Sequence, residues 1–366
     1  MIKYKLYSIP IFELRSDSSK ISGMSLMELL VAFTIFVMLI SILVGFLFTG
    51  LGFWSTGEKR KDVYDRSQVI LEQISEDIRN TFADSDLKFT SVPAYFVCDI
   101  DRNKNQRLRF VRNGDASKLR VNIPRNLPAV PQRYYTDLFE VCYVMDSDAG
   151  KDILWRGIRY FDRNTQQGSI FSRDIDDLTS LLWRNNFAKI GDGVLYVGYK
   201  FWTQYTNTWD TKYKIKKPER GRREQIGPEV IWDSSRRTFL RDFFFFKDVF
   251  DARRPDFVYP KIVQVTLVVE PFVVGYRGSH LVDAVQENGS RIVVENPKEL
   301  PDAPSFIKIE KEWIEYKEKS GSVLTVANRG VRGTRAVSHK VGSPVKFGET
   351  FTLEVYLPAY RISEDE

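Results

Sequence analysis

The sequence predicts an α+β fold in which a long N-terminal helix packs on an antiparallel β-sheet head that carries a small inserted β module. Three observations support this class. Residues 29–54 are uncharged and apolar, and residues 58–82 repeat an apolar position every fourth residue. After residue 84, short runs rich in Val, Ile, Tyr, Phe and Trp alternate with Gly, Asn, Asp and Pro.

The composition is that of a globular protein. The chain has 366 residues, 43% of them hydrophobic, and its 54 Lys and Arg nearly balance 48 Asp and Glu. These values do not support a disordered or a disulfide-dense chain. The net charge of +6 is small and both signs are interspersed, so nucleic acid is not an expected partner.

Residues 29–54 are predicted to cross a membrane once. As a helix they would be roughly 39 Å long, which exceeds a bilayer core of about 30 Å. The preceding residues 1–23 are net positive, which predicts a cytoplasmic N-terminus and a translocated head. The alternative, a buried helix of a soluble protein, would be unusual for so long and uniform a run.

The junction before the apolar run reads Gly23-Met24-Ser25-Leu26-Met27-Glu28. It resembles the type IV prepilin signature through Gly23, Ser25, Leu26 and Glu28. In this family a prepilin peptidase cuts after the Gly and methylates the new N-terminal residue, here Met24, where the family usually has Phe. The resemblance implies a leader of residues 1–23 and a mature chain of 366 − 23 = 343 residues.

Glu28 is the one charge in the apolar stretch. An acid at such a depth costs several kcal/mol unless it is paired, so it marks a functional site by default. The resemblance implies that Glu28 pairs with the N-terminal ammonium of Met24 in a neighbouring subunit and sets helix register during assembly. The alternative is an interfacial Glu whose side chain reaches the lipid headgroups.

Residues 55–85 are predicted to continue the helix beyond the membrane residues 24–54. One face of this continuation is apolar and carries Val63, Ile70, Leu71, Ile74, Ile78 and Phe82. Residues 69–79 resemble the same region of J-type minor pseudopilins of type II secretion and of W-type minor pilins. In those families the second half of the helix packs on a β-sheet head.

The head is predicted to comprise residues 86–275 and 348–361. Strands are expected at residues 108–111, 119–123, 138–145, 153–161, 194–205, 239–246, 262–270 and 351–357. A hairpin loop at 146–152 favours antiparallel pairing. The hairpin at 141–160, the aromatic strand at 196–209 and the strand at 262–268 resemble the J-type head, in the family's order.

Residues 276–347 do not fit a compact pseudopilin head and are predicted to form the inserted β module. Strands are expected at residues 291–294, 306–309, 313–317 and 323–326, with a hairpin turn at 319–322. Residues 328–334 and His339 resemble a small β module of phage-tail and surface proteins. We expect a structural decoration, and a partner-binding face is the alternative.

Asp99, Asp101 and Asn103 form a weak calcium candidate. Their oxygen side chains alternate as at the start of a calcium loop, but Lys104 and Phe110 stand where that loop needs Gly and Glu. An Asp- and Asn-rich turn is the simpler interpretation. No other cofactor is expected.

Cys98 and Cys142 both fall on predicted strands. In an oxidising compartment they could form a disulfide. Two buried free thiols are an equal alternative, because the sequence does not define the distance between them.

No enzymatic activity is expected, because the chain has none of the sequence motifs of common catalytic sites. Its two His, His280 and His339, are interpreted as loop residues of the module. A membrane-anchored hydrolase with carboxylates assembled in space is the remaining enzymatic alternative. The basic run at 212–223 is interpreted as a solvated loop, with contact to anionic headgroups, cell-wall polymer or DNA as the alternative.

Together these features predict a minor pseudopilin near the tip of a type II secretion-like pseudopilus. The resemblance implies as partners a prepilin peptidase, other major and minor pseudopilins or pilins, and an inner-membrane assembly platform. The head would lie in the periplasm or outside the cell. A minor pilin of a type IV pilus or DNA-uptake machine is the alternative within this class, and a singly anchored surface adhesin is the alternative outside it.

Overall fold

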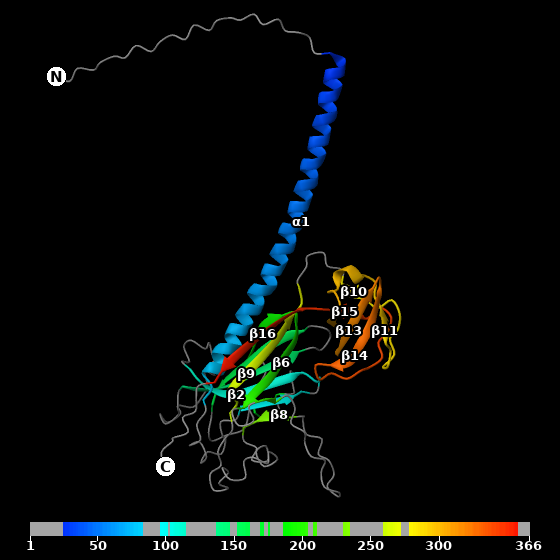
Figure 1. Cartoon of the computed structure of the whole chain (residues 1–366). Coiled ribbons are helices and arrows are strands. Elements are labelled where there is room, and N and C mark those ends of the chain that lie inside the picture. Colours follow the sequence, from blue (N-terminus) through cyan, green and yellow to red (C-terminus); the bar gives the residue numbers. More distant parts are fainter. Residues whose placement is uncertain are drawn as a thin grey trace, which may run out of the picture. The chain divides into compact units, whose positions relative to one another are not determined.

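In the part of the chain that the computed structural model describes, there are one long helix and three β-sheets (Figure 1). The chain divides into two compact units, one ending at Gly57 and the other beginning at Glu58. The described residues are 25–82, 96–101, 103–114, 137–146, 152–161, 169–171, 175, 186–203, 208–210, 230–234, 259–271 and 278–357.

Helix α1 spans Leu26–Arg79, which confirms that one helix runs through both the apolar and the amphipathic segment. The sequence predicted that the helix would continue to residue 85, but it ends at Arg79. The residues that follow pair instead with strand β2 (Gln106–Asn113). The N–H of Phe82 donates to the carbonyl of Val111 at 2.8 Å, and the N–H of Asn113 donates to the carbonyl of Asn80 at 2.8 Å. These bonds satisfy backbone groups that a longer helix would need for itself.

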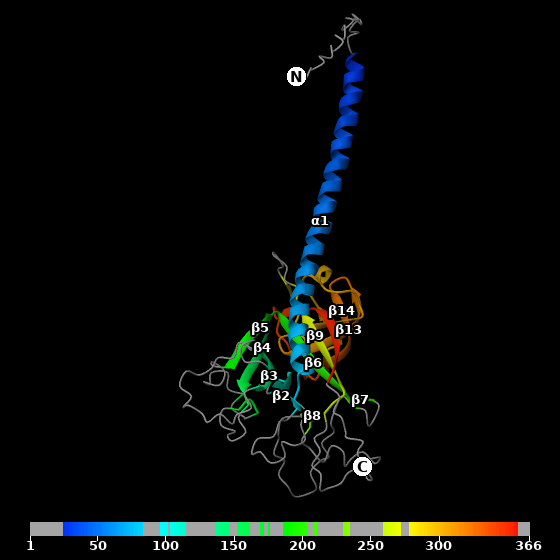
Figure 2. The same ribbon diagram turned by 90° about the vertical axis from the view of Figure 1, so that its left-hand side faces the viewer.

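Two antiparallel sheets form the head, in the orders β5-β4-β3-β2-β1-β8 and β16-β9-β6-β7. Figure 2 shows β2 to β5 side by side in the first of them. The strands of the first sheet are β1 Phe96–Ile100, β2, β3 Leu138–Asp146, β4 Ile153–Tyr160, β5 Phe187–Asp192 and β8 Val230–Asp233. Those of the second are β6 Val194–Thr203, β7 Thr208–Asp210, β9 Ile262–Val269 and β16 Glu349–Tyr356.

The second half of α1 packs into a core that both sheets share. Val63, Ile70, Ile74 and Ile78 are at most 2% exposed, so the predicted apolar face is confirmed. Gly191 on β5 allows the close approach, because a Cβ there would lie 2.6 Å from Ile70 Cδ1.

Residues 278–347 build a third sheet, in the order β10-β15-β12-β13-β14-β11, around a hydrophobic core of its own. We call this region the β module. Its two-residue hairpin loop contains Gly321 with a φ of 56°, as a tight hairpin turn requires. Its elements are β10 Ser279–His280, β11 Arg291–Val293, the 3₁₀ helix η5 Pro297–Glu299, β12 Ser305–Ile309, β13 Glu312–Ser320, β14 Val323–Val331 and β15 Pro344–Lys346.

Most predicted strands that fall on described residues are confirmed within a few residues of their predicted ends. No predicted strand range covers β5, β8, β10 or β15, and no range was given around Cys98, where β1 lies. Of these, β5 contains Lys, Gly and Asp and is an edge strand, so its pairing with β4 outweighs its weak intrinsic propensity. The strands predicted at 119–123 and 239–246 lie outside the described residues.

Candidate functional site

The start of α1 is closed by a reciprocal pair of hydrogen bonds. The N–H of Ser25 donates to Glu28 Oε2 at 2.9 Å, and the N–H of Glu28 donates to Ser25 Oγ at 3.3 Å. This is a capping box, which satisfies backbone donors that the first turn of a helix leaves free. Sequence reasoning missed it, although the spacing Ser25-Leu26-Met27-Glu28 carries the signal.

The segment Leu26–Trp54 of α1 is long and apolar enough to cross a membrane. Its large side chains are solvent-exposed within this chain, as Phe46 at 79% and Leu43 at 66% illustrate. Its hydroxyl groups are satisfied inside the helix: Ser41 Oγ donates to the carbonyl of Val37 and Thr49 Oγ1 to that of Gly45, both at 2.9 Å. A lipid environment demands this internal satisfaction, because it offers no water as a partner.

Asp77 links the second half of α1 to the first sheet through buried hydrogen bonds and ion pairs. Its carboxylate is fully buried and accepts two hydrogen bonds from Arg156, at 2.7 and 2.9 Å, and one from the Tyr143 hydroxyl at 2.5 Å. Arg112 forms a further ion pair with it. Burial, and then the charge of Asp77, raise the pKa of the Tyr143 phenol well above its ordinary value, so this hydroxyl remains a donor.

The Asp77 site was not foreseen, although the sequence contains a signal for it. Asp77 lies seven residues after Ile70 and three after Ile74, so it falls on the apolar face of the helix. A buried acid on that face needs a cationic partner. The partners come from β2 and β4, and the sequence alone does not assign them.

A second buried charge cluster joins the β module to the head, and we call it the Asp152 cluster. Asp152 precedes β4 of the head, and its two carboxylate oxygens accept from Lys308 Nζ and Lys346 Nζ, each at 2.5 Å. Lys308 lies on β12 and Lys346 on β15 of the β module. The ion pairs therefore tie three strands from two sheets together.

Beside this cluster, Arg332 occupies an aromatic cage. Its guanidinium carbon lies 4.2 Å from the ring centre of Trp313, 4.7 Å from that of Phe306 and 5.0 Å from that of Tyr196. Tyr196 belongs to β6 of the head, whereas Phe306 and Trp313 belong to the β module. The cation–π contacts thus add to the joint between the two.

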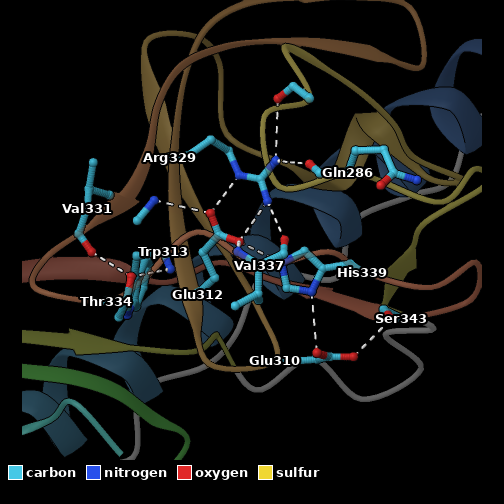
Figure 3. Close-up of polar contacts among 12 residues, drawn as sticks. Gln286, Glu310, Glu312, Trp313, Arg329, Val331, Thr334, Val337, His339 and Ser343 are labelled. Atoms are coloured by element: carbon cyan, nitrogen blue, oxygen red, sulfur yellow. Dashed lines mark hydrogen bonds and ion pairs between the residues drawn. The ribbon is translucent and has the colours of Figure 1, made fainter.

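A third network lies inside the β module around Glu312, as Figure 3 shows. Arg329 binds Glu312 with two hydrogen bonds at 2.6 and 2.8 Å, and His339 Nε2 lies 2.8 Å from Glu312 Oε2. Burial alone would raise the pKa of Glu312, but the hydrogen bonds from Arg329 and His339 lower it to about 2. His339 is therefore a buried partner of a carboxylate, which corrects its interpretation as an ordinary loop residue.

The predicted processing residues Gly23 and Met24, and the basic run at 212–223, lie outside the described residues. The other predicted sites have defined partners. Asp99 is buried between Arg107 at 2.6 Å and Arg109 at 2.7 Å, and Asp101 Oδ1 accepts the N–H groups of Asn103 and Asn105. Among the described residues no cluster of three His, Cys, Asp or Glu has metal-binding geometry. Calcium at this turn stays a prediction.

Cys98 and Cys142 are buried free thiols, so the disulfide alternative is wrong for this structure. Cys98 pairs with Leu108 of β2, whereas Cys142 pairs with Arg109, the next residue of that strand. Successive residues of a strand point to opposite faces of the sheet, so the two thiols do also. Burial raises the pKa of both, that of Cys142 to about 12.

The chain is thus an α+β protein with one N-terminal helix able to span a membrane, which is consistent with single-pass anchoring. No family model matches the sequence, and no curated protein or solved structure is detectably similar to it.

Proposed function

We propose that the protein is a minor pseudopilin subunit that assembles through α1 at or near the tip of a type II secretion-like pseudopilus and promotes protein export. One observation carries the proposal. A single continuous helix begins at the Ser25–Glu28 capping box, exposes apolar side chains as far as Trp54, and then buries a stripe of Ile in an antiparallel β-sheet head.

In this proposal the apolar half of α1 holds the subunit in the cytoplasmic membrane until assembly. Cleavage between Gly23 and Met24 frees an N-terminal ammonium. The same apolar surface then packs against neighbouring helices in the fibre, where van der Waals contacts of its exposed Leu, Ile, Val and Phe side chains replace contacts with lipid.

Glu28 is suited to the assembly step because its carboxylate is only partly engaged. Oε2 accepts from the N–H of Ser25, whereas Oε1 has no partner among the described residues. The ammonium of a neighbouring Met24 can therefore bind Oε1 while the cap stays intact. This pairing would lower the cost of holding the acid at membrane depth.

The first experiment determines the mature N-terminus after co-expression with a prepilin peptidase, by intact mass and peptide analysis. We expect loss of residues 1–23 and a methylated Met24. An uncut chain, or a cut after the apolar segment, would contradict the proposal and favour a singly anchored adhesin.

A second experiment separates charge pairing from capping at Glu28. Glu28→Gln keeps an acceptor for the Ser25 N–H but removes the charge, whereas Glu28→Leu removes both. If Glu28 binds an ammonium, both variants should be cleaved normally and both should be lost from fibres. Normal incorporation of Glu28→Gln, with loss of Glu28→Leu, would show that the cap alone matters.

A further inference from the structure

The Asp152 cluster brings an amine and a carboxyl group into reacting distance in a buried place. Lys308 Nζ lies 2.5 Å from Asp152 Oδ1 and also donates to the carbonyl of Leu195 at 3.1 Å. The side chains of Lys308 and Asp152 are 3% and 4% exposed. Such a fixed arrangement replaces a bimolecular encounter by an intramolecular one, which is worth several powers of ten in rate.

The backbone holds Asp152 in place. Its φ is 46°, a left-handed conformation that Asp tolerates better than most residues, and its carbonyl accepts the N–H of Val194 at 2.9 Å. The carboxylate is therefore aimed at the β module by the start of β4, and its position does not depend on the ion pairs alone.

Apolar side chains flank this pair, alongside the charged groups of Lys346 and Glu270. Leu195, Val268 and Trp313 form a small buried cluster where the head meets the β module, and Tyr196 and Phe306 pack on it. Both side chains are almost fully buried, so the charged forms of both groups lose solvation.

The protonation of the cluster follows from this burial. Desolvation lowers the pKa of Lys308, against the opposing charge of Asp152, and the nearby charge of Lys346 lowers it further. A desolvated lysine is the usual source of a neutral, nucleophilic amine at moderate pH. Lys346 is more exposed, at 24%, and lies 3.9 Å from Glu270.

We propose that Lys308 and Asp152 condense to form an intramolecular isopeptide bond that covalently joins the β module to the head. The reaction needs no oxidant and no cofactor, and its only by-product is water. It links β12 to the residue that precedes β4, so one bond would tie together parts of the chain 156 residues apart.

The step balances with the groups present. The Lys308 ammonium gives one proton to Asp152 Oδ1, and the resulting amine attacks Cγ, so that a C–N bond forms. Negative charge develops on Oδ2 in the tetrahedral intermediate. Lys346 Nζ already donates a hydrogen bond to Oδ2, so it stabilises this oxyanion. A second proton then passes from Nζ to Oδ1, the Cγ–Oδ1 bond breaks, and water leaves. The amide retains the third proton.

Intact-mass measurement of the full chain under denaturing conditions tests the proposal. We expect the wild-type chain to be lighter than its sequence requires by one water molecule. Lys308→Arg keeps the positive charge but not the reactive amine, so it should have its full mass. Asp152→Ala should also have its full mass, because either substitution removes one of the two reacting groups.

Tryptic peptides then identify the bond. Cleavage after Lys151 and Arg156 releases residues 152–156, and a modified Lys308 resists trypsin, so its peptide comprises residues 299–311. A branched peptide joining these two segments would establish the bond. A wild-type chain of full mass, or a branch to residues 341–361 that contain Lys346, would overturn the assignment.

Discussion

The two halves of α1 have the same secondary structure and opposite surroundings. From Leu26 to Trp54 the large apolar side chains are exposed, whereas after Glu58 the apolar residues Val63, Ile70, Ile74 and Ile78 are buried in the head. The first half has apolar residues on all sides, and the second has them on one face. The distribution of apolar residues around a helix therefore indicates its surroundings, while helix formation itself does not.

The acidic side chains of the two halves also lie in different environments. In the first half Glu28 lies in the first turn of the helix, where its carboxylate accepts the N–H of Ser25. In the second half Asp77 is fully buried in the middle of an apolar face and is held by Arg112 and Arg156. A buried acid of this kind fixes the position of a helix only as long as its partners are present.

The largest effect is expected from Asp77→Ala. The change leaves the guanidinium groups of Arg112 and Arg156 buried without their carboxylate, which should cost about 3–5 kcal/mol of unfolding free energy. Urea unfolding of the full chain in detergent, followed by Trp fluorescence, measures it. The control is Glu72→Ala on the exposed face, which should change stability by less than about 0.5 kcal/mol. Similar values for both would contradict the assigned role of Asp77.

The contrast between the two halves can be tested with matched truncations. Ile74→Ala removes a fully buried side chain and should destabilise the head by about 2–5 kcal/mol in the same assay. Leu43→Ala truncates a side chain that is 66% exposed and should leave head unfolding unchanged. A loss of head stability in Leu43→Ala would show that the apolar half also packs on protein in the single subunit.

The buried acid of the β module should respond to pH. The pKa of Glu312 is lowered from an ordinary 4.5 to about 2, so its stabilising contribution is complete above pH 4.5 and is lost as the pH falls towards 2. Glu312→Gln should unfold more readily at pH 7 and lose less stability on acidification. Glu318→Gln, at an exposed position of the same strand, should retain the wild-type pH profile. Unfolding curves from pH 7 to 2 provide the comparison.

The smallest effect is expected at the start of α1. Ser25→Ala removes one half of the capping box, which should weaken the first turn by about 1 kcal/mol. Hydrogen exchange in lipid nanodiscs should then be faster for the amides of residues 26–29. Ser41→Ala, whose hydroxyl bonds only within the helix interior, should leave those amides unchanged. Equal exchange in all three proteins would argue against the cap.

The predictions that the structure confirms rest on patterns among residues that are close together in the sequence. The membrane segment, the Ile stripe, the hairpin at 141–160 and the turn at Gly321 depend on periodicity and turn chemistry within short stretches. The contacts that the sequence did not predict depend on strand register. Asp99 alternates with other oxygen donors along the chain, yet its partners Arg107 and Arg109 face it from the neighbouring strand.

Neighbouring residues thus determine the single apolar helix, its amphipathic continuation and the strand-rich head, because hydrophobic spacing and the exclusion of charge are local properties of the chain. The partners of Asp77, Asp152 and Glu312 depend on the folded whole. Asp77 meets Arg112 across 35 residues, and Asp152 meets Lys346 across 194. These contacts depend on the order and register of the strands in the sheets. Strand order and register follow from the packing of all the strands together, so short-range sequence patterns do not encode them.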